Sequence, residues 1–337
     1  MGRVNTEAER YETLKFMIGL NLPKTPFENL SFSYISKVLY KELRSYFALC
    51  AMARGKSKYK ETAQEILFSS RVKIEKNIHY RASRAVQKNP ELLPELLKQK
   101  FFGASKKQGI SIRLPLSSCE PTKLCSNLCY AHDVLDAAPA SVIRGSLNGL
   151  IGSLFQTEPD KIIPFLELYW DKQIKKAIQV AHDENELTSF DRKSRIRFGH
   201  VGDGAAYAEF MNFLASKAKL FSNGSVQSVI YTRHRSAKDL NTDLFAINFT
   251  LDPTSEERIE FAPKDARIVY SAFGGKTSKK AEINFLEHHR FMHYSQIGEG
   301  NVCPATIPES EDRSCDALKC DKCFVQNLSF LREPDGK

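Results

Sequence analysis

The chain has 337 residues, of which 42% are hydrophobic and 10% aromatic, a composition typical of a globular protein with one or two domains. No apolar run approaches the roughly 18 residues that a membrane-spanning helix needs. The opening stretch MGRVNTEAERYETLKF mixes charged and apolar positions and has no signal-peptide core. These features argue against a disordered or membrane-embedded protein. We expect a cytoplasmic one whose cysteines meet a reducing environment.

The net charge of +9 is concentrated near the N-terminus. Residues 1–110 carry 21 Lys and Arg against 10 Glu and no Asp, while the remainder is close to neutral. Two interpretations stay open. This region either attracts a nucleic acid or a nucleotide, or it presents a solvated, Lys-rich helical face.

Residues 1–105 are predicted to form this basic α-helical region. Apolar side chains recur at three- and four-residue spacing from Ile35 through Leu39 to Leu49, as expected for an amphipathic helix. A second helical pattern covers residues 58–87, and a short helix is expected to begin near Pro90 and to end at Gly103.

From residue 106 to residue 300, short β-branched segments alternate with helical ones. The predicted strands are residues 109–116, 195–202, 226–232, 244–251 and 266–273, and a long helical segment covers residues 139–182. Such alternation predicts an α/β fold built from parallel β-α units, either a partial parallel (β/α) barrel or an open sheet.

Three cysteines, Cys119, Cys125 and Cys129, follow the first predicted strand within eleven residues. The loop after a strand is where α/β folds place their ligands. Three thiolates leave one coordination position open on a metal, whereas His132 could complete a closed Cys3His zinc site. The spacing alone does not choose between iron–sulfur and zinc.

A second group consists of Cys303, Cys315, Cys320 and Cys323, and it ends in a Cys-x-x-Cys pair. Four cysteines are a complete ligand set for a zinc ion or a cubane cluster. Residues 301–337 are therefore predicted to be a C-terminal metal-binding segment. Cys50 lies in an apolar helical stretch and is interpreted as a core residue.

The cysteine-containing stretches SSCEPTKLCSNLCYA and NVCPAT…CDALKCDKCF resemble the phage gene product 88 family. They are also similar to related phage proteins with a three-cysteine motif that look like diverged radical S-adenosylmethionine enzymes. The strand RIRFGHVGDG, with its Gly202-Asp203, and the later Tyr231-Thr232-Arg233 carry the likeness further. The resemblance spans roughly residues 108–325.

The resemblance implies a 4Fe–4S cluster on Cys119, Cys125 and Cys129, with S-adenosylmethionine bound to the remaining iron. The late cysteines would then hold a second, auxiliary cluster, and the segment Gly202, Asp203 and Gly204 would approach the methionine moiety. A carboxylate there could accept a hydrogen bond from an ammonium group. The spacing Cys-x5-Cys-x3-Cys is longer than the Cys-x3-Cys-x2-Cys usual in radical S-adenosylmethionine enzymes.

The leading hypothesis is thus an iron–sulfur protein that resembles these enzymes and acts on a nucleotide or a nucleic acid. The alternative is a non-catalytic zinc protein that binds nucleic acid and uses both cysteine groups structurally.

Overall fold

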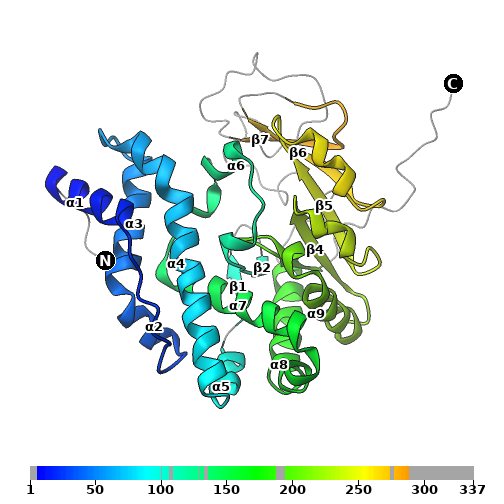
Figure 1. The fold of residues 1–337 in the computed structure, drawn as a ribbon. Helices are drawn as coiled ribbons and strands as arrows, with labels where there is room; N and C mark the ends of the chain where they lie inside the picture. The colour runs from blue at the N-terminus through cyan, green and yellow to red at the C-terminus, as the bar shows by residue number, and fades with distance from the viewer. Residues whose placement is uncertain are drawn as a thin grey trace. The chain divides into compact units, whose positions relative to one another are not determined.

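The computed structural model describes residues 6–99, 101–105, 109–127, 129–132, 136–186, 194–273 and 277–287. These residues form two compact units (Figure 1). The first unit comprises the described residues within 1–101, 113–170 and 200–202, and the second comprises those within 102–112, 171–199 and 203–287. The predicted boundary at residue 105 lies near the first crossing between units, but the loop with the first three cysteines belongs to the unit of the N-terminal helices. The predicted segment 301–337 lies outside the described residues.

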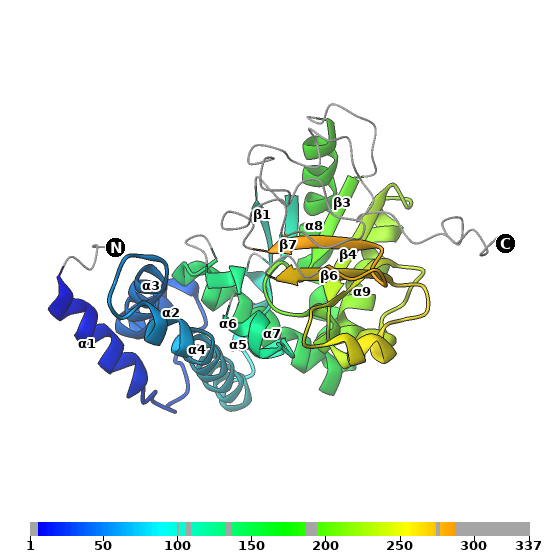
Figure 2. The same cartoon turned by 90° about the horizontal axis from the view of Figure 1, so that it is seen from above.

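The first unit is helical, as predicted for the N-terminal region. Its elements are α1 (Glu7–Ile18), α2 (Phe32–Val38), α3 (Tyr40–Arg54), α4 (Lys60–Lys88), α5 (Leu92–Lys98), the short helices η1 (Leu116–Ser118), α6 (Lys123–Asn127) and η2 (Tyr130–His132), α7 (Pro139–Thr157), and α8 (Pro159–Glu186) as far as Trp170. Helix α4 packs against α3, α7 and η1, so it is the central element of this unit (Figure 2).

Local sequence signals explain where several of these helices begin. Thr6 and Glu9 form a reciprocal capping box at the start of α1, in which each side chain accepts a hydrogen bond from the other residue's backbone N–H. Ser31 caps α2 by accepting a hydrogen bond from the N–H of Tyr34. The predicted continuous helix through Leu39 is divided there, because this residue leaves helical geometry with φ −105° and ψ 25°.

The second unit contains a seven-stranded sheet in the order β1-β2-β3-β4-β5-β6-β7. The strands are β1 (Phe102–Ser105), β2 (Gly109–Ile112), β3 (Ser194–Phe198), β4 (Val226–Thr232), β5 (Phe245–Leu251), β6 (Arg267–Phe273) and β7 (Ile283–Glu287). Strand β1 is antiparallel to β2, and all later neighbours are parallel. The predicted α/β class is confirmed, with an open sheet rather than a closed barrel.

The three connections between β3 and β6 lie on one face of the sheet. Helix α9 (Ala208–Phe221) links β3 to β4, η4 (Arg235–Asp239) links β4 to β5, and η5 (Glu256–Phe261) links β5 to β6. A Cβ on Gly204 would come within 2.7 Å of Ile230 Cδ1 and 3.5 Å of Met211 Cγ of α9, so Ile230 faces this helix. Asn212 of α9 donates to the carbonyl of Asp239, and Tyr270 donates to Glu256, which places η4 and η5 on the same side.

The segment that leads into the sheet differs from the prediction made for it. The helix expected from Pro90 to Gly103 ends at Lys98, and the chain then forms the edge strand β1. Strand β7 was also missed. Both are short edge strands of four and five residues, which give little alternation to detect.

No helix in the described part of the chain combines the length and the apolar character needed to cross a bilayer.

Candidate metal centre

The first three cysteines lie on a loop of the first unit that consists mostly of short helical turns. Cys119 follows η1, Cys125 lies within α6, and Cys129 precedes η2. The N–H of Cys119 donates to the carbonyl of Leu116, and the N–H of Cys125 donates to Thr122 Oγ1 at 3.0 Å. These local hydrogen bonds hold the backbone turns around Cys119 and Cys125.

A buried ion pair on α4 holds both ends of this cysteine loop. Arg71 Nε lies 2.8 Å from Glu75 Oε1, and neither side chain is exposed to solvent. At the start of the loop, Glu75 Oε2 accepts a hydrogen bond from the N–H of Ser117. At its end, Arg71 Nη1 donates to the carbonyls of Ala131 and Asp136 at 2.6 and 2.9 Å.

The pKa values of this pair reflect burial. Burial raises the pKa of Glu75, although the Arg71 charge and backbone N–H donors oppose it. Burial alone would lower the pKa of Arg71, but the neighbouring Tyr46 and Glu75 raise it, so the guanidinium stays charged. A charge buried at this depth is tolerated only when it is hydrogen-bonded, and here the loop backbone supplies several of the partners.

Two of the three cysteines gather around one apolar cluster. Leu116, Ala131 and Val201 are buried together, and the half-buried Cys119 and Cys129 pack against them. Among the cysteines of the described ranges, which include Cys50, no pair forms a disulfide. Cys50 is buried in α3, which confirms its interpretation as a core residue.

His132 lies at the end of the loop and is 3% exposed. Its Nδ1 is hydrogen-bonded to the hydroxyl of Tyr46 at 2.8 Å, whereas its buried Nε2 has no hydrogen-bond partner among the described residues. Burial lowers the pKa of His132 to about 3, and the positive charges of Arg71 and Arg54 add to this. The imidazole is therefore neutral at physiological pH, which is the form that binds metals.

A second polar group, formed by Asp136, Arg113 and His200, flanks the loop in the same unit. Asp136 Oδ1 lies 3.2 Å from both Arg113 Nη2 and His200 Nε2. Burial alone would raise the pKa of Asp136, but the hydrogen bond and charge of His200 and the charges of Arg113 and Arg71 outweigh this. The pKa of Asp136 consequently lies below its ordinary value, and the carboxylate is ionised.

Gly202 brings the chain that follows β3 against the segment that enters the cysteine loop. The N–H of Leu114 donates to the carbonyl of Val201 at 2.8 Å. Gly202 has φ +76°, and a Cβ there would lie 2.6 Å from the carbonyl oxygen of Pro115. Only glycine fits this approach, because the atoms it would strike are backbone atoms. Close packing against the backbone of Leu114 and Pro115 thus explains why a glycine occupies position 202.

Asp203 and Gly204, predicted to approach a cofactor with Gly202, belong to the second unit. Asp203 is buried. Its Oδ1 accepts hydrogen bonds from Thr232 Oγ1 at 2.7 Å and from the N–H of Ala205 at 3.0 Å, and its Oδ2 accepts one from the N–H of Arg233. Burial raises the pKa of Asp203 despite these donors. Both of its oxygens therefore bond the segment after β3 to the end of β4, and the role of Asp203 as a cofactor ligand stays a prediction.

The salt bridge between Arg233 and Asp252 continues this chain of contacts to the end of β5. Arg233 Nη1 lies 2.7 Å from Asp252 Oδ2, and Asp252 Oδ1 accepts from the backbone and hydroxyl of Thr254. Strand-end residues of three neighbouring strands are thus connected at the edge where parallel sheets usually bind ligands.

The second predicted cysteine group, Cys303, Cys315, Cys320 and Cys323, lies outside the described residues. Within the described part of the chain, no three His, Cys, Asp or Glu side chains are close enough to share one metal ion.

Sequence reasoning missed Arg71 and Glu75, which support the loop from a helix assigned to another domain. A signal for Arg71 was present: it lies four residues after Leu67 and three before Ile74, on the buried face of α4.

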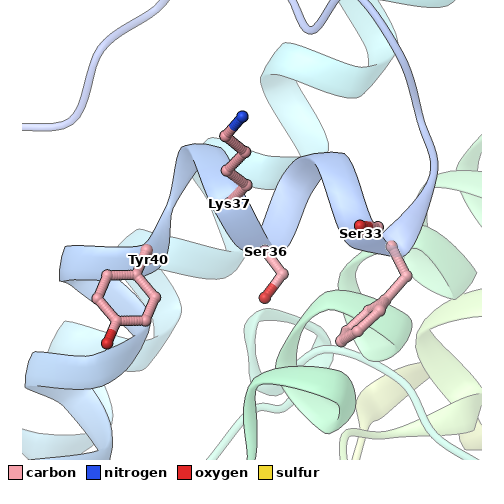
Figure 3. A pocket seen from close by; sticks show the side chains of 5 residues that line it. Ser33, Ser36, Lys37 and Tyr40 are labelled. Atoms are coloured by element: carbon pink, nitrogen blue, oxygen red, sulfur yellow. The ribbon is translucent and has the colours of Figure 1, made fainter.

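A shallow hollow on the surface of the first unit lies over α2 and the start of α3. Phe32, Ser33, Ser36, Lys37 and Tyr40 line it (Figure 3). Phe32 is 44% exposed and Tyr40 is 55% exposed. The basic N-terminal region thus presents two exposed rings beside a lysine.

Comparison of the chain with models of protein families, with curated proteins and with solved structures gives no match in any of the three.

Replacing Arg71 with Met should destabilise the protein by about 3–5 kcal/mol, because it leaves the buried Glu75 carboxylate and two loop carbonyls without this donor. Urea denaturation followed by circular dichroism measures the loss. Arg84→Met is the matched control, since Arg84 is an exposed arginine of the same helix, and its expected effect is within about 0.5 kcal/mol. Equal effects of the two substitutions would contradict the anchoring role of Arg71.

Gly202→Ala and Gly224→Ala separate backbone strain from close packing. Gly224 has φ +75° but nothing within 4 Å of a Cβ, so its replacement should cost about 1–2 kcal/mol. Gly202 has the same φ and also meets Leu114 and Pro115, so its replacement should cost about 3 kcal/mol or more. Urea midpoints measure both, and similar shifts would show that the close approach at Gly202 is unimportant.

Proposed function

We propose that the protein is an iron–sulfur protein in which Cys119, Cys125 and Cys129 bind a 4Fe–4S cluster and Cys303, Cys315, Cys320 and Cys323 bind a second metal centre. The observation that carries this proposal is the support of the cysteine loop. The buried ion pair of α4 bonds to its backbone at both ends, and two of its thiols pack on one apolar cluster. A loop held in this way restricts the cysteines before a cluster binds, which lowers the ordering cost of binding.

The donor chemistry of the loop fits such a cluster. Its cysteines are half-buried thiols, which are the ligands that iron–sulfur clusters use. Three cysteines leave one iron without a protein ligand, and when bound such a cluster supplies an electron to a molecule held at that iron. The residues of this chain would position the cluster and limit the access of water to it. S-adenosylmethionine is the molecule we propose there, on the resemblance of the cysteine motifs.

Substitution of Cys125 tests the proposal in protein purified without oxygen. We expect iron and sulfide in equal amounts and a brown colour in the native protein, and loss of the iron of one cluster in Cys125→Ala. Cys50→Ala is the control, because Cys50 is a thiol of α3 outside the loop, and its iron content should match the native protein. Colourless native protein that contains zinc would contradict the proposal.

The second candidate function is a zinc protein with a Cys3His site that binds nucleic acid without catalysis. The neutral imidazole of His132 favours it, because its Nε2 is buried without a hydrogen-bond partner among the described residues. The Tyr46 hydroxyl on Nδ1 would fix the ring, as hydrogen bonds to metal-bound histidines commonly do.

His132→Ala distinguishes the two metal centres. If the loop holds zinc with His132, this substitution should release zinc by metal analysis, as Cys125→Ala does. If the loop holds a cluster on three cysteines, iron and sulfide should remain after His132→Ala. The urea midpoint of each variant shows whether a loss of metal follows from unfolding.

The partner we propose for the basic N-terminal region is a nucleic acid or nucleotide. Exposed aromatic rings beside lysines can stack on bases while the lysine contacts phosphate. The hollow that contains Phe32, Lys37 and Tyr40 offers this combination (Figure 3).

Binding of a labelled single-stranded oligonucleotide, followed by fluorescence anisotropy, tests this partner. Tyr40→Ala should weaken binding by about 1–3 kcal/mol through the loss of one stacking contact, and affinity should fall steeply as salt rises. Tyr80→Ala is the control, because Tyr80 is an exposed tyrosine of α4 outside the hollow. No binding at low salt, or equal effects of the two variants, would contradict the assignment.

A further inference from the structure

The hollow over α2 and the start of α3 contains two exposed aromatic residues. Phe32 is the first residue of α2 and Tyr40 is the first residue of α3. Ser36 lies one helical turn after Phe32, so these two share a face of α2. Figure 3 shows the side chains of Ser36 and Tyr40 directed to one side and that of Lys37 to the other. The hollow has a volume of about 540 Å³, which is within the range of ligand-binding pockets.

Three exposed basic side chains lie in or next to this hollow. Lys37 lines it, and Lys41 and Arg44 follow Tyr40 on α3, with Arg44 one turn beyond Tyr40. Among the described residues, none of the three forms a salt bridge. Lys41 Nζ instead lies 4.6 Å from the ring centroid of Phe16. All three cations are therefore open to an anionic partner.

Acidic residues are absent from the segment that forms the hollow. The sequence has no Asp or Glu from residue 29 to residue 41, and α7, which packs against α2, contains none. Of the three glutamates of α1, which packs against α3, one pairs with Lys58 and one caps its own helix. The charge of this surface is thus complementary to a polyanion, which can contact several cations at once.

The two aromatic rings are available to separate partners. Phe32 and Tyr40 lie two helical turns apart in the chain, on different helices. Within the described part of the chain they make no ring contact with each other. Each ring can therefore stack on a base of its own.

We infer that this hollow selects single-stranded nucleic acid, with Phe32 and Tyr40 stacked on two different unpaired bases. The inference rests on the proposed nucleic-acid partner and specifies the form that binds. A ring stacks on the face of a base, and in a duplex the neighbouring base pairs cover those faces. Lys37, Lys41 and Arg44 contact phosphates, which both forms present. Preference for a single strand therefore comes from the rings, and general affinity comes from the cations.

Competition against a labelled oligothymidine, followed by fluorescence anisotropy of the full-length protein, tests the inference. The competitors are an unlabelled single strand and the blunt duplex that it forms with its complement. The single strand should bind about tenfold or more tightly than the duplex at the same salt concentration, because two stacking contacts are lost in the duplex. Equal affinities would overturn the inference and leave the proposed partner standing, whereas no binding of either form would remove both.

Substitutions of Tyr40 test whether stacking carries the preference. Tyr40→Leu keeps an apolar side chain without a ring and should lower the single-strand to duplex affinity ratio by about fivefold or more. Tyr40→Phe keeps the ring and should retain that ratio. Tyr80→Leu is the matched control, because Tyr80 is an exposed tyrosine of α4 outside the hollow. An equal loss in Tyr40→Phe and Tyr40→Leu would assign the effect to the hydroxyl and overturn the stacking role.

The double variant Phe32→Leu/Tyr40→Leu tests whether the rings hold two bases. Its loss of single-strand affinity should equal the product of the two single losses, because independent contacts add in free energy. A double variant no weaker than either single one would show that both rings act on one base, which contradicts the inference. The circular dichroism spectrum should stay unchanged in all three, since both side chains are exposed.

A lysine variant separates charge from stacking. Lys37→Gln should weaken single-strand and duplex binding alike, and should reduce the slope of log affinity against log salt concentration by about 0.7 for the single strand. Lys88→Gln is the control, because Lys88 is an exposed lysine at the end of α4. A change in the single-strand to duplex ratio in Lys37→Gln, as large as that in Tyr40→Leu, would overturn the division of roles between cations and rings.

Discussion

The buried ion pair between Arg71 and Glu75 is the interaction on which the organisation of the first unit depends. Burying this pair costs desolvation free energy, and its hydrogen-bond partners include the backbone of the loop that carries the cysteines. The two side chains therefore neutralise each other's charge and also hold both ends of that loop through hydrogen bonds. Although α4 is distant in sequence, it fixes the backbone at the two ends of the cysteine loop.

The second unit distributes its chemistry differently. Polar residues after β3 and at the ends of β4 and β5 bond to one another, with Asp203 and Asp252 as the acceptors. Arg195, Arg197 and Arg267 lie on one face of the sheet by strand register. Contacts at the strand ends thus hold neighbouring strands together, while the arginines of the strands share one face of the sheet.

Periodicity in the sequence predicted the class of fold because it reports which side of each element is buried. The strands β3 to β6 were located within a few residues, since their β-branched runs are bounded by polar turns. The division of the helix at Leu39 could not be predicted, because the apolar pattern continues through it. The cysteines of the loop were visible by residue type alone. Their support by α4 was not, because ion pairing between distant segments leaves no local periodic signal.

The path of the chain between the two units has a practical consequence. It crosses from one unit to the other after residues 101, 112, 170, 199 and 202. Neither unit is therefore a contiguous piece of the polypeptide, and a fragment that begins near residue 105 would contain the cysteine loop without the helix that anchors it. Truncation or limited proteolysis would therefore separate segments that belong to the same unit, instead of releasing an intact domain. Such a protein is better studied by substitution within the intact chain.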